Sequence, residues 1–322
     1  MTVLAGSRHD VRRAAARVET RPSTSAAARA VRDPGVRWTR LPAEGRLHAH
    51  HGPIDLVVGI DADEAARARA ERAVRDALEP LLATLAAELA ELRRELGGQP
   101  HVLHGPVARR MLAAVARHPG ERVTPMAAVA GAVADHALAA MRGAAALRRA
   151  FVNNGGDVAL HLDAGETLRV GVGAGREAAD EDGNAAIVVG ADDRVGGVAT
   201  SGWGGRSHSL GIADRVTVLA ADAAAADVAA TLVANACDLP GSARVRRVPA
   251  LELSPDSDLG ERAVTVGVAR LDAEERRAAL DAAVGYARAL LRRGTALGVR
   301  IELQGESRTL GRRARAGTEE RP

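Results

Sequence analysis

Aromatic side chains are almost absent from this chain, and no other sequence feature constrains its interior as strongly. The 322 residues include four aromatic residues, namely Phe151, Trp38, Trp203 and Tyr286. Hydrophobic residues still make up 47% of the chain and charged residues 26%, a balance typical of a globular protein. The core must therefore be filled by Ala, Val and Leu. Modules that stack bases on aromatic ladders are disfavoured, so we expect no nucleic-acid partner.

The basic residues carry a second restriction, because all 44 of them are arginine. Without lysine, Schiff-base chemistry and Walker-type phosphate binding are impossible. The single cysteine, Cys237, allows neither an intramolecular disulfide nor a thiolate metal cage. Residues 1–20 lack the apolar segment of a signal peptide, and aspartates interrupt the apolar stretches near 125–141 and 216–237. We therefore expect a cytoplasmic protein that does not span a membrane.

Composition divides the chain into three parts. Residues 1–45 mix Arg, Ala, Ser, Thr and Pro without a sustained period, which predicts a mobile leader, and residues 312–322 predict a disordered tail. Residues 46–311 are expected to form a single domain. Strands are predicted at 54–60, 150–162, 166–172, 185–190, 212–220, 264–269 and 297–303. Helices are predicted from Thr124 onward and at 222–237 and 272–293, which together indicate α+β or α/β layers.

Six leucines recur at alternating spacings of four and three residues, which predicts one helical seam. They are Leu78, Leu82, Leu85, Leu89, Leu92 and Leu96. Two interpretations stay open for this seam. It packs on the body of the protein, or it packs on a second copy of the chain and makes a homo-oligomer.

The predicted helix at 222–237 carries a polar stripe on an otherwise apolar surface. Asp227, Thr231 and Asn235 recur every four residues and so share one face. An ionised carboxylate among alanines needs a cation or several donors, and a carboxylate with a hydroxyl one turn later suits magnesium or calcium. The alternative is that the stripe faces solvent or that Thr231 bonds back to its own helix.

Two glycine-rich segments are candidate cofactor-binding loops. Residues 200–211 read TSGWGGRSHSLG, in which backbone amides, hydroxyls and an arginine fork could hold a phosphate. Residues 153–157 read NNGGD, in which the glycines bring the backbone close to a ligand or another strand. Plain turns are the alternative for both. The candidate cofactor-binding residues are Asn154, Gly155, Gly156, Asp157, Thr200, Ser201, Gly202, Arg206, Ser207 and Ser209.

Four segments, in matching order, resemble an uncharacterised ApbE-like family within the FAD:protein FMN transferase superfamily. They read TPMAAVAGAVAD at 124–135, VNNGGDVAL at 152–160, TSGWGGRSHSLGIADRVTVLA at 200–220 and ADVAATLVAN at 226–235. This resemblance implies an α+β, ApbE-like (T-fold-like) layered domain of sheet and helices. It also implies an enzyme that uses magnesium to split FAD and attaches FMN to a threonine hydroxyl of an acceptor protein.

The resemblance also assigns residues to the metal site. An Asp and a Thr four residues later ligate the metal in the family, which places Asp227 and Thr231 in that role, and a backbone carbonyl falls at Val129. The sequence departs from the transferase pattern at Ala130, where the pattern has Lys, and at Gly204, where it has Tyr. Two alternatives to the enzyme remain. One is a non-catalytic module that binds a flavin, pterin or nucleotide, and the other is an oligomeric structural protein with a vestigial pocket.

Overall fold

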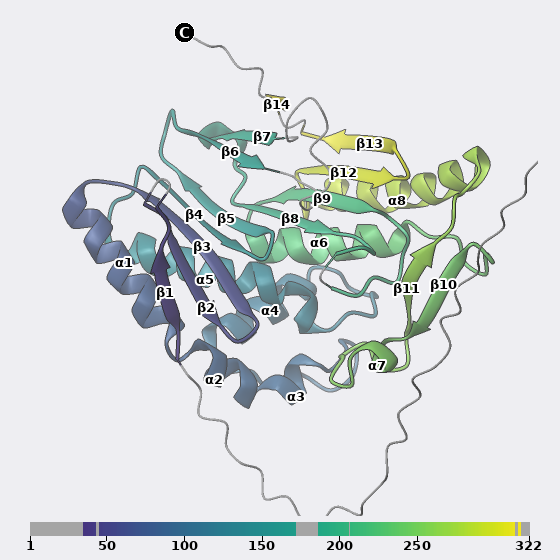
Figure 1. Ribbon diagram of the computed structural model, residues 1–322, viewed down its shortest axis with the longest axis horizontal. Helices are drawn as coiled ribbons and strands as arrows, with labels where there is room; N and C mark the ends of the chain where they lie inside the picture. The colour runs from purple at the N-terminus through teal and green to yellow at the C-terminus, as the bar shows by residue number, and fades with distance from the viewer. Residues whose placement is uncertain (1–34, 43–44, 172–185, 206, 313–314, 317–322) are drawn as a thin grey trace, which may run out of the picture. The chain divides into compact units, whose positions relative to one another are not determined.

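An antiparallel sheet of nine strands forms the centre of the protein (Figure 1). The computed structural model describes residues 35–42, 45–171, 186–205, 207–312 and 315–316, which belong to one compact unit beginning at Gly35. The strand order is β1-β2-β3-β4-β5-β8-β9-β12-β13. These strands are β1 (Arg37–Arg40), β2 (Leu47–His51), β3 (Ile54–Asp61), β4 (Arg149–Asn154), β5 (Asp157–Leu162), β8 (Gly197–Ser201), β9 (Arg215–Ala220), β12 (Gly298–Leu303) and β13 (Glu306–Gly311).

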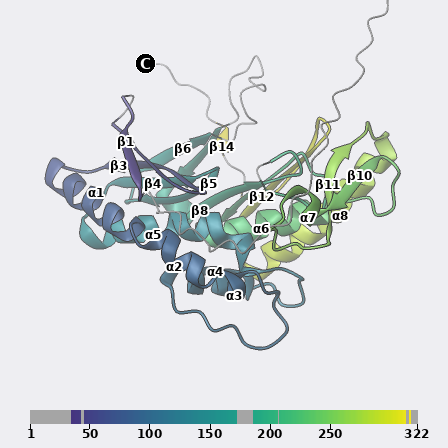
Figure 2. The same cartoon turned by 60° about the horizontal axis from the view of Figure 1, so that its bottom comes forward.

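Helices cover one face of this sheet, as Figure 2 shows. Ala159 of β5 belongs to the same buried cluster as Ala132 and Val228, which come from two of these helices. The helices are α1 (Glu64–Leu78), α2 (Leu81–Ala87), α3 (Leu89–Leu92), α4 (Pro106–Val115), the 3-10 helix η1 (Pro125–Ala128), α5 (Val129–Ala144), α6 (Ala223–Ala236) and α8 (Ala273–Arg293). Sheet and helices are thus segregated into layers, which confirms the predicted α+β class.

A smaller sheet covers the other face. Its order is β14-β7-β6, formed by β6 (Thr167–Gly171), β7 (Ala186–Gly190) and β14 (Arg315–Ala316). Val158 and Leu160 of β5 pack in the cluster that includes Val189 of this sheet, whereas Ala159 packs against the helices. Because successive strand residues point to opposite faces, Asp157 shares the helix-facing side of β5 with Ala159.

A hairpin completes the described architecture. Strands β10 (Val245–Pro249) and β11 (Ala263–Val268) pair antiparallel, and α7 (Ala250–Leu253) lies in the segment between them. A further short 3-10 helix, η2 (Ala191–Asp193), follows β7. Strand β1 lies within residues 1–45 and β14 within residues 312–322.

The leucine seam is not one continuous helix. Helix α1 ends at Leu78, Pro80 begins α2, and Glu88 separates α2 from α3. Leu78, Leu85 and Leu92 are nevertheless buried in the protein's own core, against which Leu82 and Leu96 are packed. The seam therefore packs on the body of the protein.

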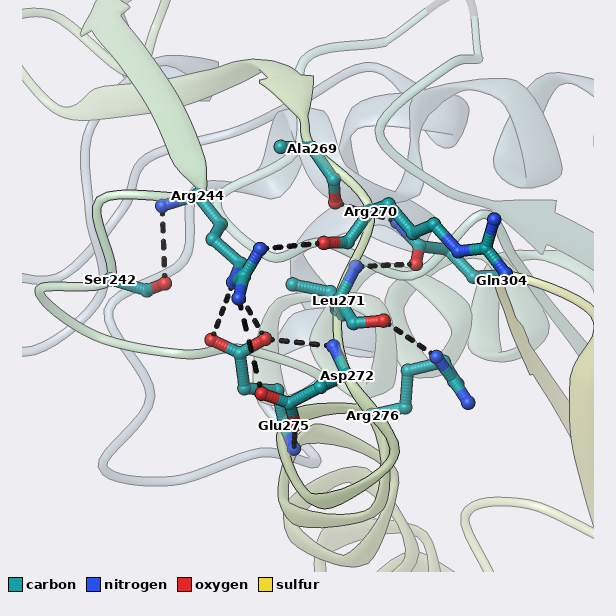
Figure 3. A network of polar contacts seen from close by, with 9 residues as sticks. All are labelled: Ser242, Arg244, Ala269, Arg270, Leu271, Asp272, Glu275, Arg276 and Gln304. Carbon is teal, nitrogen blue, oxygen red and sulfur yellow. Dashed lines mark hydrogen bonds and ion pairs between the residues drawn. The ribbon is translucent and has the colours of Figure 1, made fainter.

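Polar contacts fix the start of α8 against the β12–β13 turn (Figure 3). Asp272 caps the helix by accepting from the Glu275 amide at 2.9 Å. The Arg244 guanidinium lies 3.0 Å from one Glu275 carboxylate oxygen, and Gln304 accepts from the Leu271 amide at 2.9 Å. These bonds join three segments that are distant in sequence. Within the described residues, no helix is both long and apolar enough to cross a membrane.

Candidate functional site

The polar stripe of α6 forms the half-buried edge of an otherwise buried helix. Asp227, Thr231 and Asn235 are each partly exposed, whereas ten other residues of α6 are fully buried. The helix begins where Asp222 accepts from the Ala225 amide at 2.7 Å. The stripe is thus neither sealed in the core nor open to bulk solvent. Among the residues that the structure describes, none forms a hydrogen bond with the Thr231 hydroxyl, so the predicted back-bond to its own helix is not observed.

The start of α5 lies against the Asp227 end of the stripe. Thr124 accepts from the Met126 amide at 3.2 Å and Pro125 follows it, as the sequence predicted for a helix start. One carboxylate oxygen of Asp227, Oδ2, accepts from the Gly131 amide at 3.0 Å. Val129 is the first residue of α5, two positions before Gly131. Its carbonyl has two lone pairs, of which the helix uses one.

A second carboxylate makes the converse contact. Asp135 of α5 accepts from the amides of Ala223 and Ala224, at 3.1 Å and 3.0 Å, and these are the first two residues of α6. The Asp135 side chain is 7% exposed, and burial raises its pKa to about 6 against the opposing effect of those amides. Each helix therefore receives a carboxylate from the other at its N-terminus, where backbone N–H groups lack partners within the helix.

A third acidic residue, on the sheet, lies near the Asp227 end of the stripe. Asp157, at the start of β5, accepts from the Thr200 amide of β8 at 3.2 Å. Burial raises the pKa of Asp157 to about 7. The pKa of Asp227 lies well above its usual range because the carboxyl is desolvated and because the negative charge of Asp157 is close.

These two carboxylates have no cationic counterpart among the described side chains. The groups that favour the ionised form of Asp227 are the Gly131 and Ala130 amides, and for Asp157 it is the Thr200 amide. Two desolvated carboxylates near one another with only amide donors favour a bound cation, since a cation would offset both charges. Thr231 lies one turn after Asp227 in α6, and Val129 lies in the first turn of α5, so a hydroxyl and a carbonyl of the kind magnesium accepts come from the same two helices. The described residues contain no group of three His, Cys, Asp or Glu able to hold a metal ion, so such a site needs these neutral oxygens.

The NNGGD segment is a tight hairpin turn between β4 and β5. Asn154 pairs with Asp157, and Gly155 and Gly156 have positive φ values of 64° and 122°. The buried Asn154 side chain donates to the Ala130 carbonyl at 3.1 Å and so joins the sheet to the first turn of α5. In the structure this segment is a turn, which was the alternative interpretation. Its last residue, Asp157, is the one that lies near the α6 stripe.

The glycine-rich segment at 200–211 lies along the other end of the stripe. Asn235 accepts from the Leu210 amide at 3.0 Å and lies 3.4 Å from the hydroxyl of Ser209, which is 2% exposed. The Thr200 hydroxyl lies 3.1 Å from that of Thr217 in β9. Segment and helix are thus joined directly, as the sequence had not predicted.

Several of the predicted phosphate donors are used within the protein. The amides of Thr200, Trp203 and Gly205 bind Asp157, the Ala213 carbonyl and the Gly202 carbonyl. Gly202 is buried against the Asp214 backbone, whereas Ser201 is half-buried and Ser207 is exposed. Arg206 lies outside the described residues. Fewer of these amides are therefore available to a phosphate than the sequence predicted.

Of the aromatic residues Trp203 and Tyr286, one lies in this loop and the other does not. Trp203 lies within it and donates from Nε1 to Asp214 at 3.2 Å. Tyr286, on α8, donates to Glu121 at 2.8 Å instead. Of these two, only Trp203 is part of this loop.

Sequence reasoning missed Asp135, although a signal was present. A lone aspartate in an alanine-rich helix pointed to Asp227, and the same pattern surrounds Asp135 in α5. Its partners, Ala223 and Ala224, lie 88 and 89 residues further along the chain. The pattern marks the residue, but only the fold identifies what it binds.

A family model described as "AbpE bacteria" matches residues 38–309, most of the chain. The chain belongs to this AbpE bacteria family. UPF0280 proteins of methanogens are also similar. That of Methanosphaerula palustris is 43% identical over 136 residues, covering 41% of this chain and 53% of the relative. That of Methanothermobacter thermautotrophicus is 33% identical over 189 residues, covering 56% and 71%.

This AbpE bacteria family member spans about half the length of the Methanosphaerula relative that it matches. Among solved structures, the apo form of the flavinyl transferase ApbE of Pseudomonas stutzeri is 15% identical, with a TM-score of 0.34. That match covers 62% of this chain and 83% of the other. The ApbE protein of Thermotoga maritima is 17% identical with a TM-score of 0.31, covering 64% and 88%.

Proposed function

We propose that this protein is a magnesium-dependent enzyme acting on FAD, with Asp227, Thr231 and the Val129 carbonyl as metal ligands. The observation that carries this proposal is the pair of desolvated carboxylates, Asp157 and Asp227, without a cationic side chain among the described residues. Calcium has the same preference for oxygen ligands and is the alternative cation. Membership of the AbpE bacteria family supports the flavin as ligand.

The proposed reaction transfers FMN to a threonine hydroxyl of an acceptor protein. The hydroxyl oxygen forms a bond to the FMN phosphorus, the bond to the bridging oxygen of FAD breaks, AMP leaves, and the hydroxyl proton is released. A bound magnesium ion would neutralise part of the negative charge of the pyrophosphate. In this proposal the hydroxyls of Ser201, which is half-buried, and Ser207, which is exposed, hold phosphate oxygens. Trp203 is the aromatic residue of the loop that a flavin ring approaches.

A non-catalytic flavin-binding module is the second candidate, and one observation favours it. Both carboxylates already bind backbone amides, Asp227 that of Gly131 and Asp157 that of Thr200. Such bonds stabilise the fold without any metal. Binding of FAD that needs neither magnesium nor Asp227 would support this candidate.

The direct test is incubation of the protein with FAD and Mg²⁺, followed by measurement of AMP release. Asp227→Asn should abolish release, whereas Asp281→Asn, at an exposed position of α8, should leave it unchanged. An absorbance scan of freshly purified protein will show any retained flavin. Failure to bind FAD and failure to release AMP would together contradict the proposal.

A further inference from the structure

Helices α5 and α6 adjoin at their N-termini, where glycine allows a backbone contact. A Cβ atom added to Gly131 would lie 2.2 Å from the Ala223 carbonyl oxygen, far inside the closest approach of real atoms. The first turn of α5 therefore touches the first residue of α6. In Figure 1 both helices lie on the same side of the sheet, below β5 and β8.

From this contact the two helices exchange carboxylates with the same spacing. Asp135 lies four residues after Gly131 and binds Ala223 and Ala224 with its two oxygens. Asp227 lies four residues after Ala223 and binds Gly131. Four residues is about one helical turn, so each carboxylate lies one turn beyond the contact and reaches back to the other helix.

This exchange makes the position of Asp227 dependent on Asp135. The Asp227 side chain is held by amides of the first turn of α5, Gly131 and Ala130, and the two bonds from Asp135 tie that helix to the first residues of α6. The Asp222 side chain lies at the same end of α6, and its partners among the described residues are the Ala225 amide of its own helix and, at 3.2 Å, Arg117. Asp222 therefore stabilises the helix without joining α6 to α5.

We infer that Asp135 is a positioning residue, which holds the first turns of α5 and α6 in the register that places the Asp227 carboxylate for a cation. The inference rests on the proposed function for the cation and on the contacts above for the positioning. Asp135 uses both oxygens on backbone amides, and its Oδ2 also lies 4.0 Å from a guanidinium nitrogen of Arg110. Its effect passes through Gly131 and Ala223 to Asp227.

The positioning is tested by amide hydrogen exchange at Gly131. This amide is in the first turn of α5, where N–H groups lack an acceptor within the helix, so its protection reports on Asp227. Asp135→Ala should speed its exchange about tenfold, the loss expected for one hydrogen bond. Asp222→Ala should leave it unchanged although it removes a cap from the same helix. Asp135→Asn keeps one acceptor oxygen, should give an intermediate rate, and serves if the alanine variant does not fold.

The consequence for the site is tested by Mn²⁺ affinity, measured calorimetrically on the folded variants. Loss of a residue that orients a metal ligand typically weakens metal binding by about ten- to a hundredfold. We expect this change for Asp135→Ala and no change for Asp222→Ala. Unchanged Gly131 exchange in both Asp135 variants would overturn the inference. If the wild-type protein binds no cation, the proposed function fails, and the Gly131 exchange still decides the positioning. If the wild-type protein and all the variants bind Mn²⁺ with equal affinity, the inference fails and the proposed function stands.

Discussion

Asp157 of β5 lies close enough to Asp227 of α6 for its charge to help raise the pKa of Asp227. Each of them is held by a backbone amide. This arrangement costs free energy whenever both groups are ionised and no cation is bound. At neutral pH the protein can avoid this cost in one of two ways. One carboxyl group retains its proton, or the pair binds a metal ion.

Replacing Asp157 with Asn should stabilise the metal-free protein above neutral pH. The pKa of Asp157 in the folded state, about 7, exceeds its usual value of 3.8, so the folded state binds the proton more tightly than the unfolded one. Wild-type stability is therefore lost as the pH rises from about 4 through 7. The variant should gain about 1–3 kcal/mol over wild type at pH 8 and nothing at pH 4. Urea unfolding at both pH values, with EDTA present, measures this difference.

Removing the buried carboxylate of Asp135 should destabilise the protein. Asp135→Ala leaves the amides of Ala223 and Ala224 buried without acceptors, at a cost of about 1–3 kcal/mol. The same change at the exposed Asp281 should cost less than about 0.5 kcal/mol. Thermal unfolding of the two variants provides the comparison. Equal melting temperatures would contradict the capping role.

The close approach of α5 and α6 predicts opposite effects for two glycines in α5. Gly131→Ala places a methyl group against the Ala223 backbone and should destabilise by about 1–3 kcal/mol. At Gly143 an added Cβ meets no described heavy atom within 4 Å apart from its chain neighbours and its own helix backbone, so Gly143→Ala should stabilise by about 0.5–1 kcal/mol because alanine favours the helix. Denaturant unfolding curves will distinguish the two. A stable Gly131→Ala protein would show that the helices separate more easily than this contact implies.

Acid should weaken the protein through His118. This side chain is 1% exposed, neither of its ring nitrogens has a hydrogen-bond partner among the described residues, and burial lowers its pKa. A depressed histidine pKa means that the unfolded state takes up the proton first, so stability is lost as the pH falls below about 6.5. His118→Leu should flatten this part of the curve of melting temperature against pH. If the slope between pH 5 and 7 is the same in both proteins, His118 is not its source.

Tryptophan fluorescence should reveal where a flavin binds. Trp203 lies in the 200–211 loop, whereas Trp38 lies on β1 beneath Arg75, whose guanidinium carbon is 4.4 Å from the ring centre. FAD should quench Trp203, so the signal should respond to FAD in Trp38→Phe and not in Trp203→Phe. Quenching retained in Trp203→Phe would place the ligand elsewhere.

Sequence patterns predicted much of this fold where the signal is local. The α6 stripe, the Thr124 start and the strands around Val152 follow from spacing over a few residues. The leucine spacing predicted one helix where three occur, because periodicity alone does not register the interruptions at Pro80 and Glu88.

The partners of the site residues could not be predicted in the same way. Asp227 and Gly131 are 96 residues apart in the chain, and nothing near either residue names the other. The glycine-rich loop shows the same limit. Its amides look available in the sequence, yet Asp157 and the Gly202 and Ala213 carbonyls occupy three of them once the chain folds.

The single cysteine ends α6, next to the loop that Asn235 holds. Cys237 is fully buried, its carbonyl accepts from the Ile212 amide at 2.7 Å, and burial raises the pKa of its thiol to about 12. A maleimide reagent therefore reacts only during moments when this end of the helix opens, since the thiolate is the reactive form. The rate of labelling at Cys237 therefore measures how often this end of the helix opens. Slower labelling in the presence of FAD would show that the bound ligand makes these openings rarer.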